Sequence, residues 1–143
     1  KANLQQAAKD AGVDPARLIF AKPAALDVHL ARHRLADLFL DTSPYGAHAT
    51  ACDALYAGLP VLTERGTAFA ARIGASLLTA AGLPELIAES SADYERLALE
   101  LARDPARLKA ARDKLAGGSP LFDTPRLARD MEAAFEAMLA ARV

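Results

Sequence analysis

The chain has 143 residues, of which 52% are apolar and 24% are charged, and its formal net charge is -1. This length predicts one domain with a substantial core, and the near-zero charge argues against nucleic acid or an anionic membrane as a partner. The single cysteine excludes an internal disulfide bond and leaves the redox compartment open. The sequence contains no apolar run near the ~20 residues that cross a bilayer.

The first third of the chain predicts helices and strands in alternation. Apolar residues at helical spacing indicate a helix over 4–11, which Gly12 ends. LIFA (18–21) is a continuous apolar run, the pattern of a strand that is buried on both faces of a parallel sheet. A helix over 24–34 follows. The chain starts within a helical pattern and without an initiator methionine, so we expect a piece of a longer protein.

The alternation continues and then stops. LFLD (38–41) and PVLT (60–63) predict two more buried strands, and 86–89 predicts either a fourth strand or a short turn. Helices are expected between and after these strands, over 50–57, 69–81, 92–103, 105–115 and 125–141. Strands that alternate with helices predict an α/β protein with a doubly wound parallel sheet. We expect the last three helices, a helical extension over about 92–143, to cap one edge of the sheet or to reach elsewhere.

The loop after 38–41 is the first candidate site, because ligands of parallel sheets bind beyond the carboxyl ends of the strands. Its sequence, TSPYGAHATACDAL, places His48 and Thr50 where unpaired helix N–H groups attract an anion such as phosphate. Asp53 lies about one turn further on and suits a neutral hydroxyl pair, such as that of a ribose. The alternatives are that His48 caps the helix and that Asp53 compensates the helix dipole.

Three further features have competing interpretations. His29 and Arg32 share a helix face and form a positive corner with Lys22, which suits phosphate or is a solvated face. His33 and Arg34 are expected on the surface. Thr67, after the strand over 60–63, is a helix cap or a ligand contact, and the cap is favoured.

Other chemistry finds little support in the sequence. The histidines and the cysteine lack zinc-ligand spacing, and the chain contains no GxGxxG motif and no P-loop. Cys52 has no evident base partner and is expected to be a buried, unreactive thiol.

The run LADLFLDTSPYGAHATACDALYAGLPVLT resembles the catalytic region of the O-linked N-acetylglucosamine transferases, the SPINDLY-like family. That family carries G-H-T-T-x-x-D followed by A-G-x-P-x-V-T. The later segments AARIGASLLTAAGLPELIAES and SPLFDTPRLARDMEAAFEAM are also similar to it. The resemblance covers nearly the whole chain.

This resemblance implies a Rossmann-like lobe, the C-terminal half of a GT-B glycosyltransferase, that spans residues 1–143 as one domain. It implies that His48 and Thr50 contact the diphosphate of a UDP-sugar, Asp53 its ribose, and His29 and Arg32 its uracil and entrance. The parent enzyme would transfer N-acetylglucosamine from UDP-GlcNAc to serine or threonine of a protein, inverting and without a metal or other cofactor. It would be cytoplasmic. The proposed catalytic base and the acceptor groove of the family lie outside this segment.

The chain departs from the family pattern at three positions. A threonine common in the family is Ala49 here, an asparagine is Gly46, and an upstream lysine is Leu26. The alternatives are therefore an inactive nucleotide-binding or protein-interaction module, or a transferase with another donor such as GDP-fucose or a lipid or glycan acceptor. The isolated chain is expected to be inactive and, if an edge strand is exposed, to self-associate.

Overall fold

The structure is a computed structural model that describes residues 1–141. Its centre is a parallel sheet in which β1 (Phe39–Leu40), β2 (Val61–Glu64) and β3 (Ile87–Ala88) lie in chain order. Each strand lies within or beside an apolar run that predicted it. The expectation that the run 38–41 is buried is wrong, because β1 is an edge strand and its Leu40 is 55% exposed. The ambiguous run at 86–89 therefore forms a strand, preceded by the 3-10 turn η3 (Pro84–Leu86).

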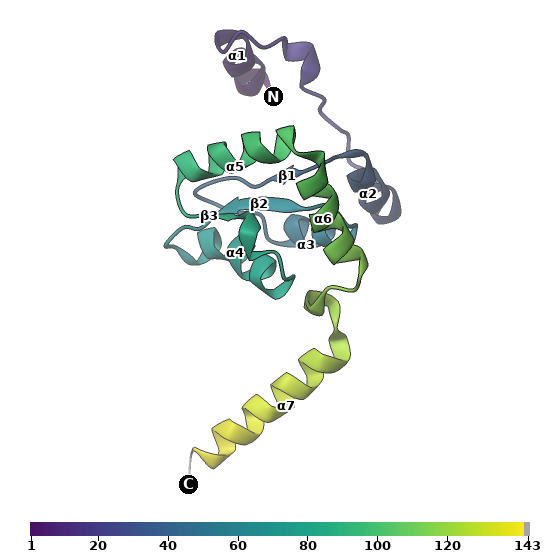
Figure 1. Cartoon of the computed structure of the whole chain (residues 1–143), viewed down its shortest axis with the longest axis vertical. Coiled ribbons are helices and arrows are strands. Elements are labelled where there is room, and N and C mark those ends of the chain that lie inside the picture. The colour runs from purple at the N-terminus through teal and green to yellow at the C-terminus, as the bar shows by residue number, and fades with distance from the viewer. Residues whose placement is uncertain (142–143) are drawn as a thin grey trace.

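Helices cover both faces of this sheet, which confirms the α/β, doubly wound architecture. α3 (Ala49–Tyr56) and α4 (Phe69–Ala80) lie on one side and α5 (Ser91–Arg103) on the other (Figure 1). Adjacent residues of β2 point to opposite faces. Val61 packs in the cluster that contains Leu78 of α4, and Leu62 packs against Leu97 of α5. α5 is therefore a layer of the domain rather than a cap on its edge.

Local signals in the sequence set the ends of these helices. α3 and α4 both end before a glycine with positive φ, 82° at Gly58 and 77° at Gly82, a conformation that other residues rarely adopt. The side chain of Ser90 caps α5 by accepting from the N–H of Asp93. Asp104 caps α6 (Pro105–Ala116) in the same way.

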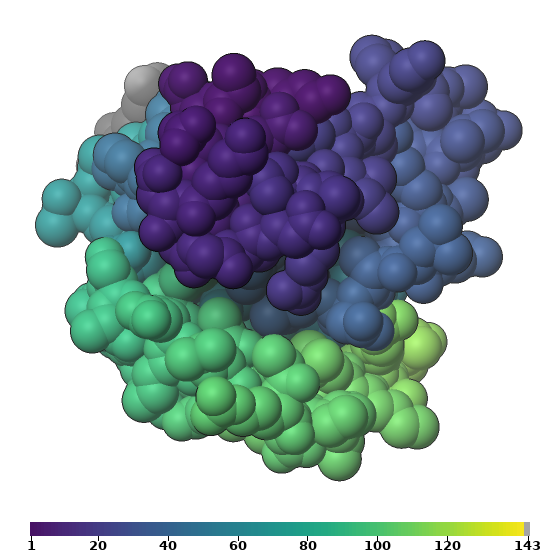
Figure 2. All heavy atoms as spheres, turned by 90° about the horizontal axis from the view of Figure 1, so that it is seen from above, coloured from purple at the N-terminus to yellow at the C-terminus, as the bar shows by residue number. Residues whose placement is uncertain are grey.

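The N-terminal segment differs from the prediction. α1 (Ala2–Asp10) and the 3-10 turn η1 (Pro15–Arg17) form, but the expected strand over 18–21 does not. Ile19 is 91% exposed, and within residues 1–141 no strand lies beside this run. A strand needs a neighbour for its N–H and C=O groups, so an apolar run without one stays extended. Figures 1 and 2 show this segment standing above the sheet domain, nearest the viewer in Figure 2.

The chain then returns to the domain through α2 (Leu26–Arg32) and the 3-10 turn η2 (His33–Leu35). The predicted helix over 24–34 thus begins two residues late and tightens at its end. Figure 2 shows α2, in blue, beside the N-terminal segment. Its C-terminal turn lies next to α3, since Nε2 of His29 is 3.6 Å from Oδ2 of Asp53.

α7 (Thr124–Ala140) is the predicted last helix, and it extends away from the domain after the 3-10 turn η4 (Pro120–Phe122) (Figure 1). Every residue of α7 is exposed, including an apolar stripe formed by Leu127, Met131, Phe135 and Met138. Residues 142–143 of the predicted extension lie outside the described residues. Among the described helices, none is long and apolar enough to cross a bilayer.

α4 approaches the sheet closely because Gly74 has no side chain. A Cβ atom at Gly74 would lie 2.5 Å from Oγ1 of Thr63 and 2.8 Å from Oδ2 of Asp41. Neither atom is the free end of a flexible chain, since the two are joined by a hydrogen bond. The helix can therefore keep this position only with glycine there.

We predict that Gly74→Ala lowers the free energy of unfolding by about 1–3 kcal/mol, because the added methyl group overpacks the helix–sheet contact. Urea titration of the variant measures this loss. Gly117→Ala is the matched control, since its Cβ would meet only carbonyl oxygens at 3.5 and 3.6 Å and its φ of -71° suits alanine. Equal stabilities of the two variants would contradict the assignment.

Candidate functional site

The buried carboxylate of Asp41, just after β1, organises the loop that leads into α3. Its Oδ1 accepts from the N–H groups of Thr42 (2.7 Å) and Ala47 (2.6 Å), and its Oδ2 accepts from the hydroxyl of Thr63 (2.7 Å). A buried charge is tolerated only when such donors replace water. One side chain thus joins β1, β2 and the loop over 42–47.

The backbone of Asp41 is held as firmly as its side chain. Its N–H donates to the carbonyl of Leu62 in β2, and its carbonyl accepts from the hydroxyl of Tyr94 at 2.7 Å. Tyr94 belongs to α5, on the opposite face of the sheet. The neighbouring strand β2 and the helix α5 therefore both fix the end of β1.

The loop itself folds back onto α4. Gly46 is buried, its N–H lies 3.3 Å from the carbonyl oxygen of Ala70, and a Cβ there would lie 3.1 Å from both that oxygen and Oδ2 of Asp41. The hydroxyl of Thr42 donates to the carbonyl of Tyr45 at 2.7 Å. The loop is thus tightly folded, and Tyr45 stays exposed at its tip.

His48 is the N-cap residue of α3, but within the described chain its side chain caps none of the helix N–H groups. Instead the ring stacks on Tyr45, with centroids 5.5 Å apart, and meets the edge of Phe69 at 6.3 Å. Its Nε2 lies 3.4 Å from the carbonyl oxygen of Ala70, which can only accept, so this long contact favours a proton on Nε2. The alternative that His48 caps the helix is wrong. Because Nε2 contacts the carbonyl of Ala70, Nδ1 is the ring nitrogen that remains for a ligand.

A cavity of about 410 Å³ opens beside this histidine. Its lining comes from the end of β1, the loop and the start of α3, namely Phe39, Leu40, Asp41, Thr42, Tyr45, Gly46, Ala47, His48 and Thr50. Thr50 is exposed in the first turn of α3. The cavity therefore combines a helix N-terminus, a hydroxyl and an imidazole, a set that suits an anion.

His29, Arg32 and Asp53 form a second group around the other part of α3. Nη2 of Arg32 donates to Nδ1 of His29 at 2.5 Å, and its Nη1 donates to the carbonyl of Lys22 at 2.9 Å. A guanidinium only donates, so Nδ1 of His29 is unprotonated and the neutral ring carries its proton on Nε2. That Nε2 lies 3.6 Å from Oδ2 of Asp53.

Two expectations about this group are wrong. Asp53 is the fifth residue of α3, so it lies beyond the first turn and does not compensate the N-terminal dipole there. His33 is buried rather than on the surface, and its Nδ1 lies 2.8 Å from the carbonyl oxygen of His29. His33 packs edge-on against the His29 ring and supports it from within.

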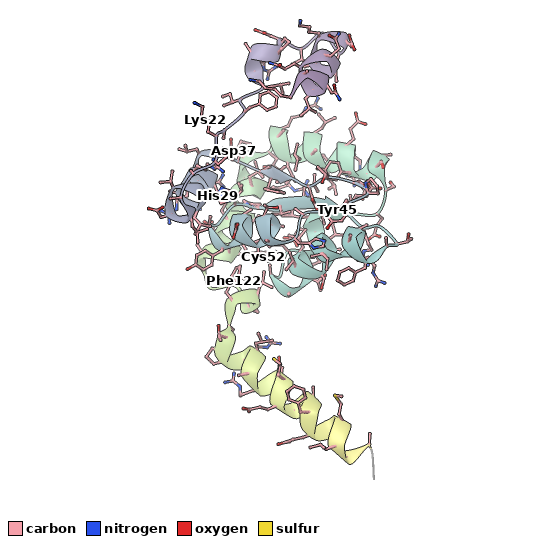
Figure 3. All side chains as sticks on the ribbon, turned by 180° about the vertical axis from the view of Figure 1, so that it is seen from behind. Lys22, His29, Asp37, Tyr45, Cys52 and Phe122 are labelled. Atoms are coloured by element: carbon pink, nitrogen blue, oxygen red, sulfur yellow. The ribbon has the colours of Figure 1, made fainter. Side chains whose placement is uncertain are left out.

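The five predicted residues thus occupy two neighbouring places around α3, with His29 and Arg32 supplied by α2. His48 and Thr50 lie at the start of α3, and Asp53 faces His29 and Arg32 one turn later. Figure 3 shows Tyr45 on one side of α3, His29 on the other, and Cys52 between them. The sequence missed Asp41, Thr63 and Tyr94. A charged residue at the end of a buried strand is a usable signal for Asp41, but its partners are distant in sequence.

The remaining candidates behave as follows. Cys52 is half-buried, and burial together with the charge of Asp53 raises the pKa of its thiol, which favours the unreactive form. Thr67 does not cap α4, since the N-cap is Ala68. Among residues 1–141, no three histidine, cysteine, aspartate or glutamate side chains gather as metal ligands do.

Comparison with known proteins identifies the family. The model of glycosyl transferase family 41 matches residues 1–131. The chain belongs to glycosyl transferase family 41. A probable UDP-N-acetylglucosamine–peptide N-acetylglucosaminyltransferase SPINDLY of Eustoma exaltatum subsp. russellianum is 40% identical over 113 residues, which are 77% of this chain. The UDP-N-acetylglucosamine–peptide N-acetylglucosaminyltransferase of Caenorhabditis elegans is 37% identical over 124 residues, or 85% of this chain.

A solved structure shows the same fold. A mutant O-GlcNAc transferase of Thermobaculum terrenum superposes with a TM-score of 0.86 at 33% identity and covers 96% of this chain. The match spans only 27% of that protein, and the two relatives above are matched over 12% and 11% of their lengths. The family 41 chain therefore corresponds to one part of a GT-B enzyme.

The departures from the family pattern now have positions in this family 41 chain. Gly46 is buried, and a Cβ there would lie 3.1 Å from Oδ2 of Asp41, so the tight loop here favours a residue without a side chain. Ala49 and Leu26 are exposed. Ala49 lacks the hydroxyl of the family threonine, and Leu26 lacks the ammonium group of the family lysine. Both differences therefore change the surface of the site and leave the buried framework unchanged.

We predict that Thr63→Val lowers the free energy of unfolding by about 1–3 kcal/mol, because Oδ2 of Asp41 loses the hydroxyl that donates to it in the interior. Thr79→Val is the matched control, since Thr79 is exposed and its hydroxyl donates to a helix carbonyl. That change should cost less than about 0.5 kcal/mol. Urea titration compares the two, and a Thr63→Val loss no larger than the control would refute the role of this bond.

Stability at alkaline pH tests the Tyr94 contact. Burial, with the charges of Asp41 and Glu64, raises the pKa of Tyr94 to about 12, whereas a tyrosine in an unfolded chain ionises near pH 10. The stabilisation is therefore complete below about pH 10 and is lost as the pH rises from about 10 to 12.

We predict that Tyr94→Phe costs about 1 kcal/mol near neutral pH, because the hydrogen bond to Asp41 is lost. Above about pH 10 the difference from the wild type should shrink. The unfolding free energies of the wild type and of Tyr94→Phe, measured near neutral pH and above about pH 10, test both effects. A gap that stays constant or widens at high pH would argue against the raised pKa.

Proposed function

We propose that this chain is the donor-binding lobe of a protein O-glycosyltransferase, which moves N-acetylglucosamine from UDP-GlcNAc to a serine or threonine hydroxyl. The observation that carries the proposal is the clamped ring of His48 at the start of α3, beside the cavity that Thr50 also lines. Family membership and the names of the relatives support the choice of donor and acceptor.

The diphosphate is assigned to the start of α3. The first N–H groups of a helix have no partner within the helix, and the dipole adds positive potential there. Thr50 contributes a hydroxyl, and His48 contributes Nδ1. Because the contact with Ala70 favours a proton on Nε2, His48 donates from Nδ1 to a phosphate oxygen only when the imidazole is protonated.

The nucleoside is assigned to the second group on α3. Asp53 accepts from the ribose hydroxyls, which are neutral donors and so do not repel its carboxylate. His29 and Arg32 lie beside it, and the bond between them holds both in place. The uracil and the entrance of the site are therefore placed next to α2.

In the parent enzyme, this lobe would stabilise the diphosphate as it leaves the sugar. Electrostatic groups that are already in place act on developing charge without reorganisation. The helix terminus, His48 and Arg32 supply the positive charge, so we propose an inverting transfer without a metal ion or other cofactor. The base that activates the acceptor would come from another part of the parent protein. We propose a cytoplasmic location on the family resemblance alone.

We predict that His48→Ala weakens UDP binding by at least about tenfold, since one charge-assisted hydrogen bond is lost. Isothermal titration calorimetry with UDP measures the effect. His48→Gln keeps a donor but cannot carry charge, so its affinity for UDP should lie between those of the wild type and His48→Ala. Arg34→Ala, an exposed change on η2, should bind as the wild type does.

Two results would contradict this assignment. The role of His48 is refuted if His48→Ala binds UDP as tightly as the wild type. The donor-lobe proposal fails if the wild-type chain gives neither heat nor a thermal shift with millimolar UDP. Binding of UDP without transfer by the full-length parent would instead favour the inactive module that the missing hydroxyl at Ala49 suggests.

A further inference from the structure

A second cavity, of about 720 Å³, runs along one face of α4 and under the loop that follows β2. We call it the α4 groove. Its lining combines two arginines, three hydroxyl side chains, one phenylalanine and a small apolar floor: Arg65, Thr67, Phe69, Arg72, Ile73, Ala75, Ser76, Thr79 and Ala80. Acidic residues are missing from this lining. None of these residues was assigned to the donor site.

The loop at the mouth of the groove is held in place by the sheet and by α4. The N–H of Arg65 donates to the carbonyl of Ala88 at 2.8 Å, which continues the β2–β3 ladder. The N–H of Gly66 donates to the carbonyl of Ala71 at 3.0 Å, and a Cβ at Gly66 would lie 2.3 Å from Cβ of Ala71. The groove therefore has a defined wall rather than a mobile one.

The charge of the groove is positive and is only partly compensated. Nη2 of Arg65 lies 3.3 Å from Oε1 of Glu89, an exposed pair that water screens. Arg72 is exposed, and within residues 1–141 its guanidinium forms no ion pair and no side-chain hydrogen bond. Five donors of Arg72 are thus free for a carboxylate or phosphate ligand.

The groove begins next to the proposed donor site. Phe69 lines the groove and also contacts the ring of His48 with its own ring, 6.3 Å between centroids. From Phe69 to Ala80 the helix rises by ~16 Å. An extended peptide covers that distance with about five residues. A small anion would occupy only the arginine end and leave the apolar floor and the hydroxyls of Ser76 and Thr79 unused.

We propose that the α4 groove binds an acidic segment of the acceptor polypeptide, as a subsite in addition to the acceptor groove that lies outside this segment. The acidic segment would lie a few residues away from the hydroxyl that receives the sugar. Carboxylates of that segment would pair with Arg72 and Arg65, and its backbone would hydrogen-bond with the hydroxyls along α4. The inference rests on the proposed function for the identity of the peptide as acceptor. The contact between Phe69 and His48 then connects acceptor binding with the diphosphate end of the donor site.

The test measures peptide and UDP binding separately on the same protein. A fluorescein-labelled peptide with one serine followed by a run of glutamates is titrated with the chain, and a peptide with glutamines instead is the matched ligand. The acidic peptide should bind more tightly, and Arg72→Ala should weaken it by about fivefold to tenfold. Arg34→Ala is the control of equal charge change. Raising the salt to about 0.5 M should weaken binding, because exposed pairs are screened.

The reversed variant Arg72→Glu should prefer a lysine-containing peptide over the acidic one, with circular dichroism confirming the fold. The proposal is overturned if Arg72→Ala binds the acidic peptide as the wild type does, or if glutamate and glutamine peptides bind alike. It is also overturned if inorganic phosphate competes as strongly as the acidic peptide, which would mark a small-anion site. If the chain binds UDP but not the acidic peptide, this inference is wrong and the donor-site proposal stands. If it binds the acidic peptide but not UDP, the donor-site proposal is wrong and the peptide-binding groove stands.

Discussion

The carboxylate of Asp41 is the interaction on which the rest of the structure depends. A charged group in the interior is costly unless hydrogen bonds replace its water, and here two backbone N–H groups and the hydroxyl of Thr63 do so. The same carboxylate occupies the space that side chains at Gly46 and Gly74 would need. The position of the loop, the approach of α4 and the start of α3 follow from this one buried group.

α3 turns that scaffold into a binding surface. Its first turn presents His48 and Thr50 to one cavity, and Asp53 meets His29 one turn later. The aromatic contacts with Tyr45 and Phe69 keep the His48 ring in one orientation, so that its unbonded nitrogen stays available. An anion and a neutral sugar hydroxyl pair can thus be bound by a single short helix, each by groups of suitable charge.

α4 has a structural role on one side and a proposed binding role on the other. Its buried side, with Gly74 and Leu78, packs against the sheet, and its exposed side lines a positively charged groove. Phe69, at its first turn, contacts His48 and lines that groove as well. The proposed donor and acceptor sites would therefore meet at the start of α4.

The sequence alone determined the helices, two of the three strands and the residues at the start of α3, because apolar periodicity, glycine stops and helix termini are local properties. Only the tertiary structure decided that LIFA stays unpaired, that His33 is buried, and that His48 is clamped rather than capping. It also decided the partners of Asp41, since Thr63 and Tyr94 lie 22 and 53 residues away. Strand pairing and burial depend on which distant segments meet in space, and a local sequence pattern cannot predict those contacts.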